Sequence, residues 1–285
     1  MTATRQAWLA AHPYLAPIAR FEAIVREAAR RVEPPRIEPP RWESCAEALA
    51  LGVPLLRCRS AAPRFASAAA YVFGRIVERA AETCPPGDVA DALEDVRSQL
   101  HRRPGDRVRI VEWTVRGAPP EVAWTNAGLL RFLGWAAVSH VLAPVVRALP
   151  ARAGGDVWRR GSCPTCGALP VLAHLAHEGA ARVRFLVCAC CRTRWRYERT
   201  ACPFCSSGAA DRLRILELDG GGPLRIDGCE DCKGYVKTYV EEGDEDLFLS
   251  DGSTLHLDVM AKNRGLRRIG TSLYELPDGE RGISA

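Results

Sequence analysis

Apolar residues in the first half of the chain recur every three or four positions, and prolines separate the runs. This spacing gives each run one apolar face, which is typical of amphipathic helices in a bundle. Ser44 and Glu47 form a capping box at the start of one such helix, and Asp88 can cap another. We leave the short run from Val108 to Arg116 open between a strand and an ordered loop. The predicted helices cover Pro17 to Val32, Ser44 to Leu51, Phe65 to Ala80, Asp88 to Leu100 and Thr125 to Leu149.

The second half has a different pattern, because its apolar residues occur in short runs separated by turns that contain glycine. Such spacing predicts β-hairpins. Pro150 to Gly155 is rich in alanine, arginine and glycine, and we place the linker there. The expected fold class is multidomain α and β, with a helical domain over residues 1–155 followed by two modules over 156–200 and 201–285. The predicted strands lie at Val171 to Leu175, Val183 to Val187, Leu213 to Leu218 and Leu224 to Ile226.

Composition places the chain among globular proteins, since 47% of its 285 residues are hydrophobic and 26% are charged. The first 16 residues contain no basic stretch that leads into an apolar one, so we expect no signal peptide and a cytoplasmic location. The most apolar window, Gly128 to Leu149, is interrupted by Arg131, His140 and Arg147. We expect a buried helix there and no contact with a membrane.

The net charge is +5, and it comes from arginine, because only three of the 39 basic residues are lysines. A charge of this size is a weak indication of nucleic-acid binding. The second module carries a run of acids without a base, which we interpret as a solvated turn, with a docking patch for a basic partner segment as the alternative. This run consists of Glu241, Glu242, Asp244, Glu245, Asp246 and Asp251.

Nine of the twelve cysteines fall between Cys163 and Cys232, and eight of these form four CxxC pairs. Two CxxC turns supply the four thiolates of a tetrahedral metal site. Pairing the first CxxC turn with the second and the third with the fourth leaves enough residues between the paired turns for a hairpin in each site. The cysteines of the second site follow the corresponding cysteines of the first by 39 residues in the first turn and by 41 in the second. This internal repeat predicts two tandem rubredoxin-like or zinc-ribbon modules. The predicted metal ligands are Cys163, Cys166, Cys188 and Cys191 in one module and Cys202, Cys205, Cys229 and Cys232 in the other.

The remaining candidate groups have plainer interpretations. Cys190 lies inside the sequence CACC, and we expect a spare, partly buried thiol, although it could replace a neighbouring ligand. His174 and His177 are expected to be solvated residues near a hairpin tip, because four thiolates already complete each site. Dithiol redox chemistry is the alternative to metal binding, but no βαβ pattern surrounds these pairs. Residues Cys45, Cys58 and Cys84 are expected in the core or on the surface of the helical domain.

A metal site closed by four thiolates leaves no open position for a substrate, so we expect the metals to fold the second half and to take no part in catalysis. The sequence also contains no Gly-rich phosphate loop, no GxSxG and no HExxH motif. We therefore expect a protein that is not an enzyme. It should hold two metal ions, iron or zinc, one in each site.

The cysteine motifs resemble those of the formate dehydrogenase accessory protein family, FdhE. The similarity covers roughly residues 155 to 275, and the helical half agrees only in general character. Cys190 and the ending Thr271-Ser-Leu-Tyr274 depart from the family pattern. The segments that carry the resemblance are Cys163-Pro-Thr-Cys166-Gly167, Leu186 to Cys191 with Thr193 and Trp195, Cys202-Pro-Phe-Cys205, Cys229-Glu-Asp-Cys232-Lys-Gly-Tyr235 and a tail with Leu257, Asp258, Gly265, Arg267 and Arg268.

The resemblance implies a cytoplasmic, rubredoxin-like accessory protein, or chaperone, that is required for formate dehydrogenase activity. It implies binding to the immature catalytic subunit during maturation, with the eight paired cysteines as ligands and iron as the suggested metal. We expect no nucleic acid as partner and leave a homodimer open. The first alternative is a nucleic-acid-binding ribbon protein that uses Trp195 and Tyr197 of the basic first module. A redox protein that cycles iron or thiols ranks last.

Overall fold

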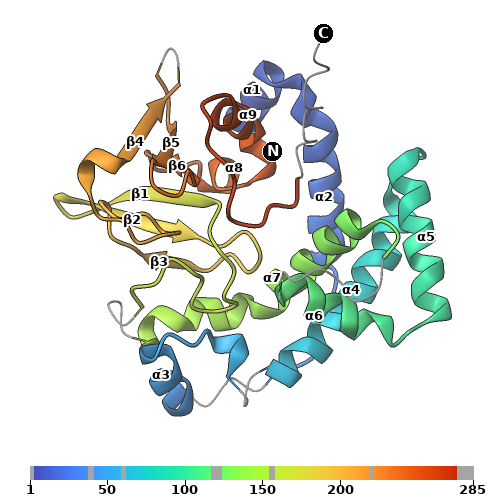
Figure 1. Cartoon of the computed structure of the whole chain (residues 1–285). Coiled ribbons are helices and arrows are strands. Elements are labelled where there is room, and N and C mark those ends of the chain that lie inside the picture. The colour runs from blue at the N-terminus through green and yellow to red at the C-terminus, as the bar shows by residue number, and fades with distance from the viewer. Residues whose placement is uncertain are drawn as a thin grey trace, which may run out of the picture.

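The computed structural model describes residues 3–37, 42–58, 62–116, 124–153, 158–218 and 221–274. Helices form its N-terminal half, a sheet with two further helices forms its C-terminal half, and the two halves lie side by side (Figure 1). The predicted fold class, helices followed by a sheet with two cysteine groups, is confirmed. The first half contains α1 (Ala3–Ala11), η1 (Pro13–Leu15), α2 (Ala16–Arg30), α3 (Trp42–Ala50), η2 (Leu55–Arg57), α4 (Ala62–Thr83), α5 (Asp88–Arg102), α6 (Asp106–Arg116) and α7 (Ala127–Ala153).

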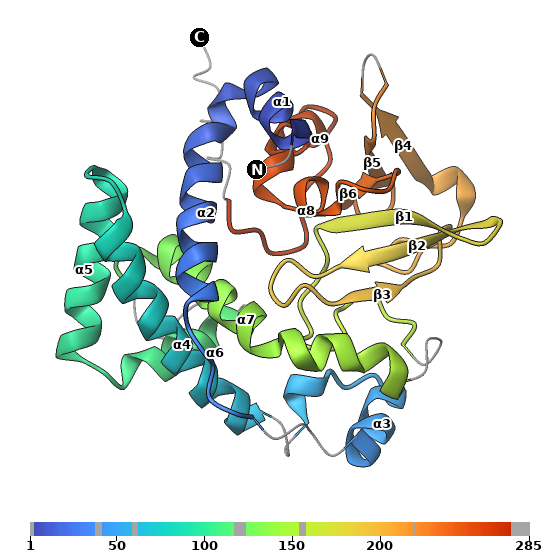
Figure 2. The same cartoon turned by 180° about the vertical axis from the view of Figure 1, so that it is seen from behind.

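The helical half is built around α4 and α7, which pack against each other. The positions of α4 that were predicted to face the core are all buried, from Phe65 through Ile76 to Ala80. The α7 helix runs from the helical bundle to beneath the sheet in both views (Figures 1 and 2). The stretch Ala127–Leu149 of α7 is long and apolar enough to cross a membrane, but half of it is buried inside the fold. It therefore serves as the core helix that the sequence predicted.

Two helix starts differ from the predictions. The α3 helix begins at Trp42, so Ser44 lies within its first turn and is not its N-cap. Gly87, and not Asp88, stands at the N-cap of α5, and Asp88 is the first helical residue. In both cases the sequence located the helix but placed its first helical residue too late, by three residues in α3 and by one in α5.

The segment left open between strand and loop is helix α6, which packs against α4 and α7. Its Ile110, Val111 and Trp113 are buried, so its core-facing positions follow helical spacing. The α7 helix continues through Ala153, which makes residues 150–153 of the predicted linker helical. The rest of that linker lies outside the described residues, and the predicted domain boundaries stay predictions.

The six strands of the described residues belong to one sheet in the order β3-β2-β1-β6-β5-β4 (Figure 2). Each module contributes three antiparallel strands, and the modules meet where β1 runs parallel to β6. Leu172 to His174 pair there with Lys237 to Tyr239. The two repeats are therefore fused into one sheet. The strands are β1 (Leu172–Glu178), β2 (Ala181–Val187), β3 (Arg194–Arg196), β4 (Leu213–Glu217), β5 (Leu224–Cys229) and β6 (Tyr235–Tyr239), followed by α8 (Glu245–Phe248) and α9 (Leu255–Asn263).

A buried ionic cluster joins the sheet to the C-terminal helices. Lys237 on β6 is 1% exposed, and its Nζ donates to Asp251 and, at 2.9 Å, to Asp258 on α9. Arg268 pairs with the same Asp258 at 2.5 Å, and Tyr235 donates to it at 2.6 Å. Asp251 is 6% exposed, so its assignment to a solvated acidic turn is wrong. Its charge holds the fold together and cannot contact a partner.

Candidate metal centres

The four CxxC turns share one backbone conformation. In each turn the N–H of the first cysteine donates to the carbonyl five residues later, at 2.8 or 2.9 Å. The residue directly after the second cysteine has a positive φ, a region that costs energy for any residue except glycine. These turns hold both thiols on the same side of the loop, which is the local geometry that two ligands of one ion require. The residues with positive φ are Gly167 (84°), Arg192 (62°), Ser206 (61°) and Lys233 (57°).

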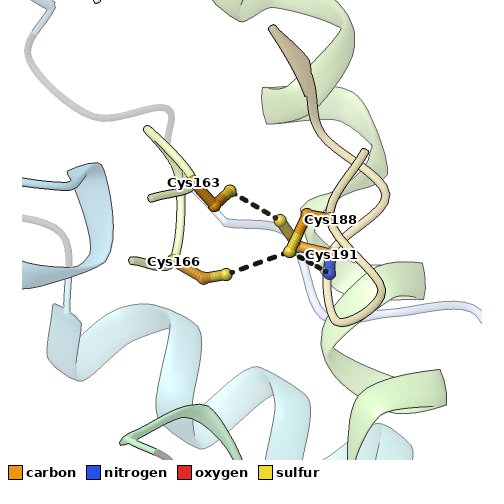
Figure 3. A group of neighbouring side chains, drawn as sticks. All are labelled: Cys163, Cys166, Cys188 and Cys191. Carbon is orange, nitrogen blue, oxygen red and sulfur yellow. Dashed lines mark hydrogen bonds between the residues drawn. The ribbon is translucent and has the colours of Figure 1, made fainter. Parts of the chain in front are cut away.

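The eight predicted ligands come together in two groups of four sulfurs, and within each group all sulfurs lie within 4.8 Å of one another. In the first group the sulfurs of Cys163 and Cys191 are 3.5 Å apart, and those of Cys166 and Cys188 are 3.4 Å apart (Figure 3). A tetrahedral ion with metal–sulfur bonds of about 2.3 Å separates its ligands by about 3.8 Å. Both groups could therefore each hold a metal ion with little movement of the loops.

The second group has the same arrangement, with distances of 3.6 Å from Cys202 to Cys232 and 3.7 Å from Cys205 to Cys229. The pairing of cysteines predicted from the spacing agrees with this grouping, although metal binding by these residues stays a prediction. Iron and zinc both accept four thiolates in this geometry.

The first group lies in the core of the molecule. All four of its cysteines are buried, and they belong to the same apolar cluster as helices α4 and α7. The turn η2 also fixes its first loop, because the N–H groups of Leu55 and Leu56 donate to the carbonyls of Pro164 and Thr165. A buried Thr193 hydroxyl lies 3.0 Å from the sulfur of Cys191 and donates to Thr165 at 2.7 Å. Helical and sheet halves therefore meet at this group.

When four thiols lie this close together, repulsion between thiolates disfavours the ionisation of all four at once. Hydrogen bonding to the neighbouring Cys163, followed by contacts with the other thiols and burial, raises the pKa of Cys166 well above its ordinary value. The pKa of Cys188 is likewise raised, with the hydrogen bond to Cys163 as its largest cause. A bound cation removes this repulsion and permits all four sulfurs to be thiolates. The donor set therefore fits a soft metal ion better than it fits four free thiols.

The second group lies at the surface. Cys202 and Cys229 are buried, whereas Cys205 is exposed and Cys232 is partly exposed. Backbone N–H groups support two of its sulfurs, with Phe204 donating to Cys202 at 3.5 Å and Gly234 to Cys232 at 3.4 Å. Solvent and small reagents therefore reach this group more easily than the first.

Cys190 lies outside both groups of four, and it is 1% exposed beside the first group. This agrees with the prediction of a spare thiol, although the thiol is fully and not partly buried. Of the three scattered cysteines, Cys45 and Cys58 are buried in the helical core. Burial, followed by the neighbouring Cys45, raises the pKa of Cys58 to about 11, so both behave as packing residues.

His174 does not lie in a solvated loop. It is 1% exposed on β1, hydrogen-bonds to the carbonyl of Glu241 at 2.7 Å and stacks on Tyr239. Burial is the main cause that lowers its pKa. His177 is exposed, as expected. Neither histidine belongs to the two sulfur groups.

Comparison with known proteins agrees with this geometry. Residues 162–199, which contain the first group, match the family model of the FdhE central domain. A protein FdhE homolog from Actinobacillus pleuropneumoniae serotype 3 is 30% identical over 143 residues, 49% of this chain and 46% of that protein. A second homolog, from Pseudomonas putida, is 29% identical over 205 residues, 68% of this chain and 61% of its own length. The chain thus spans about half the length of the curated relatives it matches.

The crystal structure of the FdhE protein from Pseudomonas aeruginosa has a similar fold. The two structures superpose with a TM-score of 0.62 at 21% identity, over 93% of this chain and 89% of the other. At this identity the likeness concerns the fold. It extends over the helical half, where the sequence motifs gave only a general similarity. The resemblance to the FdhE family that the sequence predicted is confirmed.

Proposed function

We propose that this chain, which carries an FdhE central domain and shares the FdhE fold, is an accessory protein that assists the maturation of formate dehydrogenase in the cytoplasm. In this proposal it binds the immature catalytic subunit and releases it after its cofactor is inserted. The single observation that carries the proposal is the pair of four-cysteine groups within this fold. The chain itself catalyses no reaction in this proposal.

The chemistry of the sulfur groups supports a structural role for the metals. Four thiolates complete the coordination of a tetrahedral ion, and no position is left for a substrate. A metal at the first group would connect the loops from Cys163 and Cys188 to the helical core, because that group lies among core residues. The ions would therefore stabilise one rigid surface made of helices and sheet, which suits a protein that holds a partner in place.

The nucleic-acid alternative receives less support. Its proposed stacking residue Trp195 is 6% exposed, and its indole N–H donates to the carbonyl of Arg160. The Tyr197 hydroxyl donates to the carbonyl of Cys202 at 3.0 Å. Trp195 is thus held within the first module, and the partly buried Tyr197 is tied to the second, so neither is a freely exposed ring on which bases would stack.

The test compares binding of the full chain to two forms of the formate dehydrogenase catalytic subunit, purified with and without its molybdenum cofactor. Release on maturation requires a difference in affinity between the two forms. We expect the empty subunit to bind at least about tenfold more tightly, which corresponds to about 1.4 kcal/mol. Equal affinity for both forms, or no binding to either, contradicts the proposal.

A complementation experiment in cells that lack this protein supplies the matched controls. The wild-type chain should restore formate dehydrogenase activity, and Cys163→Ser with Cys166→Ser should not, because the first metal site is lost. Cys190→Ser is the control, since this buried thiol lies beside that site but outside both groups. Its failure to restore activity, in a soluble protein with both metals bound, would assign Cys190 a role that the proposal does not give it.

A further inference from the structure

A cavity of about 350 Å³ lies where the two modules meet. Its wall includes Arg184 of the first module, Arg225 and Asp227 of the second, and the loop around Ala201 that leads into the second sulfur group. This size is in the range of small-molecule sites. Neither the FdhE resemblance nor the metal centres explains why these charged side chains line it.

The wall of the cavity carries an excess of positive charge. Among the described lining residues four are arginines and one is an acid. Arg214 is paired with Glu230 outside the cavity. The lining arginines are Arg184, Arg199, Arg214 and Arg225, and the acid is Asp227.

Arg184 is the most unusual of these residues, because its side chain is only 4% exposed and it lies in the middle of β2. Its nearest acid, Asp227, is 4.0 Å away, and its Nη1 donates to the carbonyl of Ala201 at 3.1 Å. Burial, opposed mainly by Asp227, lowers the pKa of this arginine. A guanidinium that is buried without close ionic partners is unfavourable unless an anion binds to it.

The arginines are also positioned by a second layer of contacts. The Thr238 hydroxyl donates to Asp227 at 2.8 Å, and Asp227 is ion-paired with Arg225 at 2.8 Å. Within the described part of the chain the buried Nε of Arg184 makes no hydrogen bond, whereas the Nε of Arg225 and the Oδ1 of Asp227 are the two atoms of the 2.8 Å ion pair. A buried polar atom without a hydrogen bond is rare, and this one belongs to an arginine that lines the cavity. The cavity therefore has the features of a formed site.

We propose that this cavity binds a small oxyanion, the phosphate or carboxylate group of a small molecule, between Arg184 and Arg225. Guanidinium groups bind such anions through paired, charge-assisted hydrogen bonds. Asp227 acts as a positioning residue that fixes both guanidinium groups. The site lies beside the second sulfur group, because Cys202 and Cys229 line the same cavity. The proposal is independent of the partner in formate dehydrogenase maturation.

A competing explanation is that the arginines only balance the negative charge of a metal bound by four thiolates. The two explanations differ in what the metal-loaded full chain binds. Titration calorimetry with inorganic phosphate, and separately with acetate, should show saturable binding of at least one of them at one site. Preference for phosphate indicates a phosphorylated ligand, whereas preference for acetate indicates a carboxylate.

Variants locate the binding. Arg225→Met should weaken binding by roughly tenfold or more, because a charge-assisted hydrogen bond is lost. Arg212→Met is the control, since Arg212 pairs with Asp231 at 2.7 Å near the second sulfur group but does not line the cavity. In the wild-type chain, phosphate should also protect Arg225 and the exposed Arg199 from phenylglyoxal, and this measurement needs no variant.

Three results overturn the proposal. The first is that the wild-type chain binds neither anion saturably. The second is that Arg212→Met weakens binding as much as Arg225→Met does. The third is that Arg225→Met loses metal from the second group while neither anion protects the cavity arginines. That last result assigns the arginines to charge balance at the metal centre.

Discussion

Replacing Lys237 with methionine removes the cation that lies between two buried carboxylates. Lys237 and Asp258 are each 1% exposed and Asp251 is 6% exposed, so water compensates little for the loss. Breaking a buried ion pair by removing one partner costs about 3–5 kcal/mol. We expect about 3 kcal/mol, because Arg268 still pairs with Asp258 at 2.5 Å. This is a large part of the roughly 5–15 kcal/mol that stabilises a typical domain.

Thermal unfolding at constant metal loading measures the effect. At about 2–4 °C per kcal/mol for a chain of this size, Lys237→Met should lower the Tm by about 6–12 °C. Arg212→Met is the control, because it breaks an ion pair whose side chains are 45% and 38% exposed. Exposed pairs contribute little to stability, so the control should lower the Tm much less than Lys237→Met does.

The pH dependence separates lost charge from lost packing. In the native chain, burial tends to raise the pKa of Asp251, but Lys237 and Arg268 lower it below its ordinary value. Without Lys237 this buried carboxyl group should take up a proton more readily, so the destabilisation should shrink as the pH falls toward 4. A Tm change below about 2 °C, or the same change at pH 7.5 and pH 4.5, refutes the ionic account.

Three further outcomes are expected. A chelator should remove metal from the second sulfur group first, because Cys205 is exposed. Metal release followed over time should show two phases, and Cys205→Ser should abolish the fast phase. In denaturant titrations, Gly167→Ala should destabilise the chain by about 1–3 kcal/mol, because φ is +84° and the added Cβ would lie 3.1 Å from the Pro54 ring. The control Gly105→Ala, whose added Cβ would lie in open space, should change stability by less than about 0.5 kcal/mol. Burial, followed by the neighbouring His12, lowers the pKa of His256 from 6.5 to about 4, so the native state resists protonation of this ring. The Tm should therefore fall as the pH drops from about 6.5 to 4, and it should fall less in His256→Phe.

The helices that the sequence located correctly are those whose apolar positions alone define a face. In α4 the run from Phe65 to Ala80 has this spacing, and each predicted core position is buried. Helix α6 was not recognised, because β-branched residues and Trp113 in a short run are compatible with several structures. Its conformation depends on tertiary contacts, such as the Trp135 indole that donates to the carbonyl of Thr114 at 2.8 Å.

The cysteine groups could be predicted because a CxxC turn is local and its two thiols converge whatever surrounds it. The parallel contact of β1 with β6 could not, since the repeat defines two antiparallel units but not the edge at which they meet. For the same reason Asp251 was assigned to an exposed run. Its partner Lys237 is 14 residues away in sequence, and only the folded sheet brings them together.

The two sulfur groups differ in what the loss of a metal ion would disturb. The first group shares its core with helices α4 and α7, and η2 holds its first loop by two backbone hydrogen bonds. The binding free energy of a structural metal, about 10–16 kcal/mol, is comparable to the stability of a whole domain, so loss of the ion there should unfold both halves together. The second group lies at the surface beside the arginine-lined cavity, and Cys205 is exposed. A metal ion held there would therefore exchange, or respond to the proposed anion in that cavity, while the helical half stays folded.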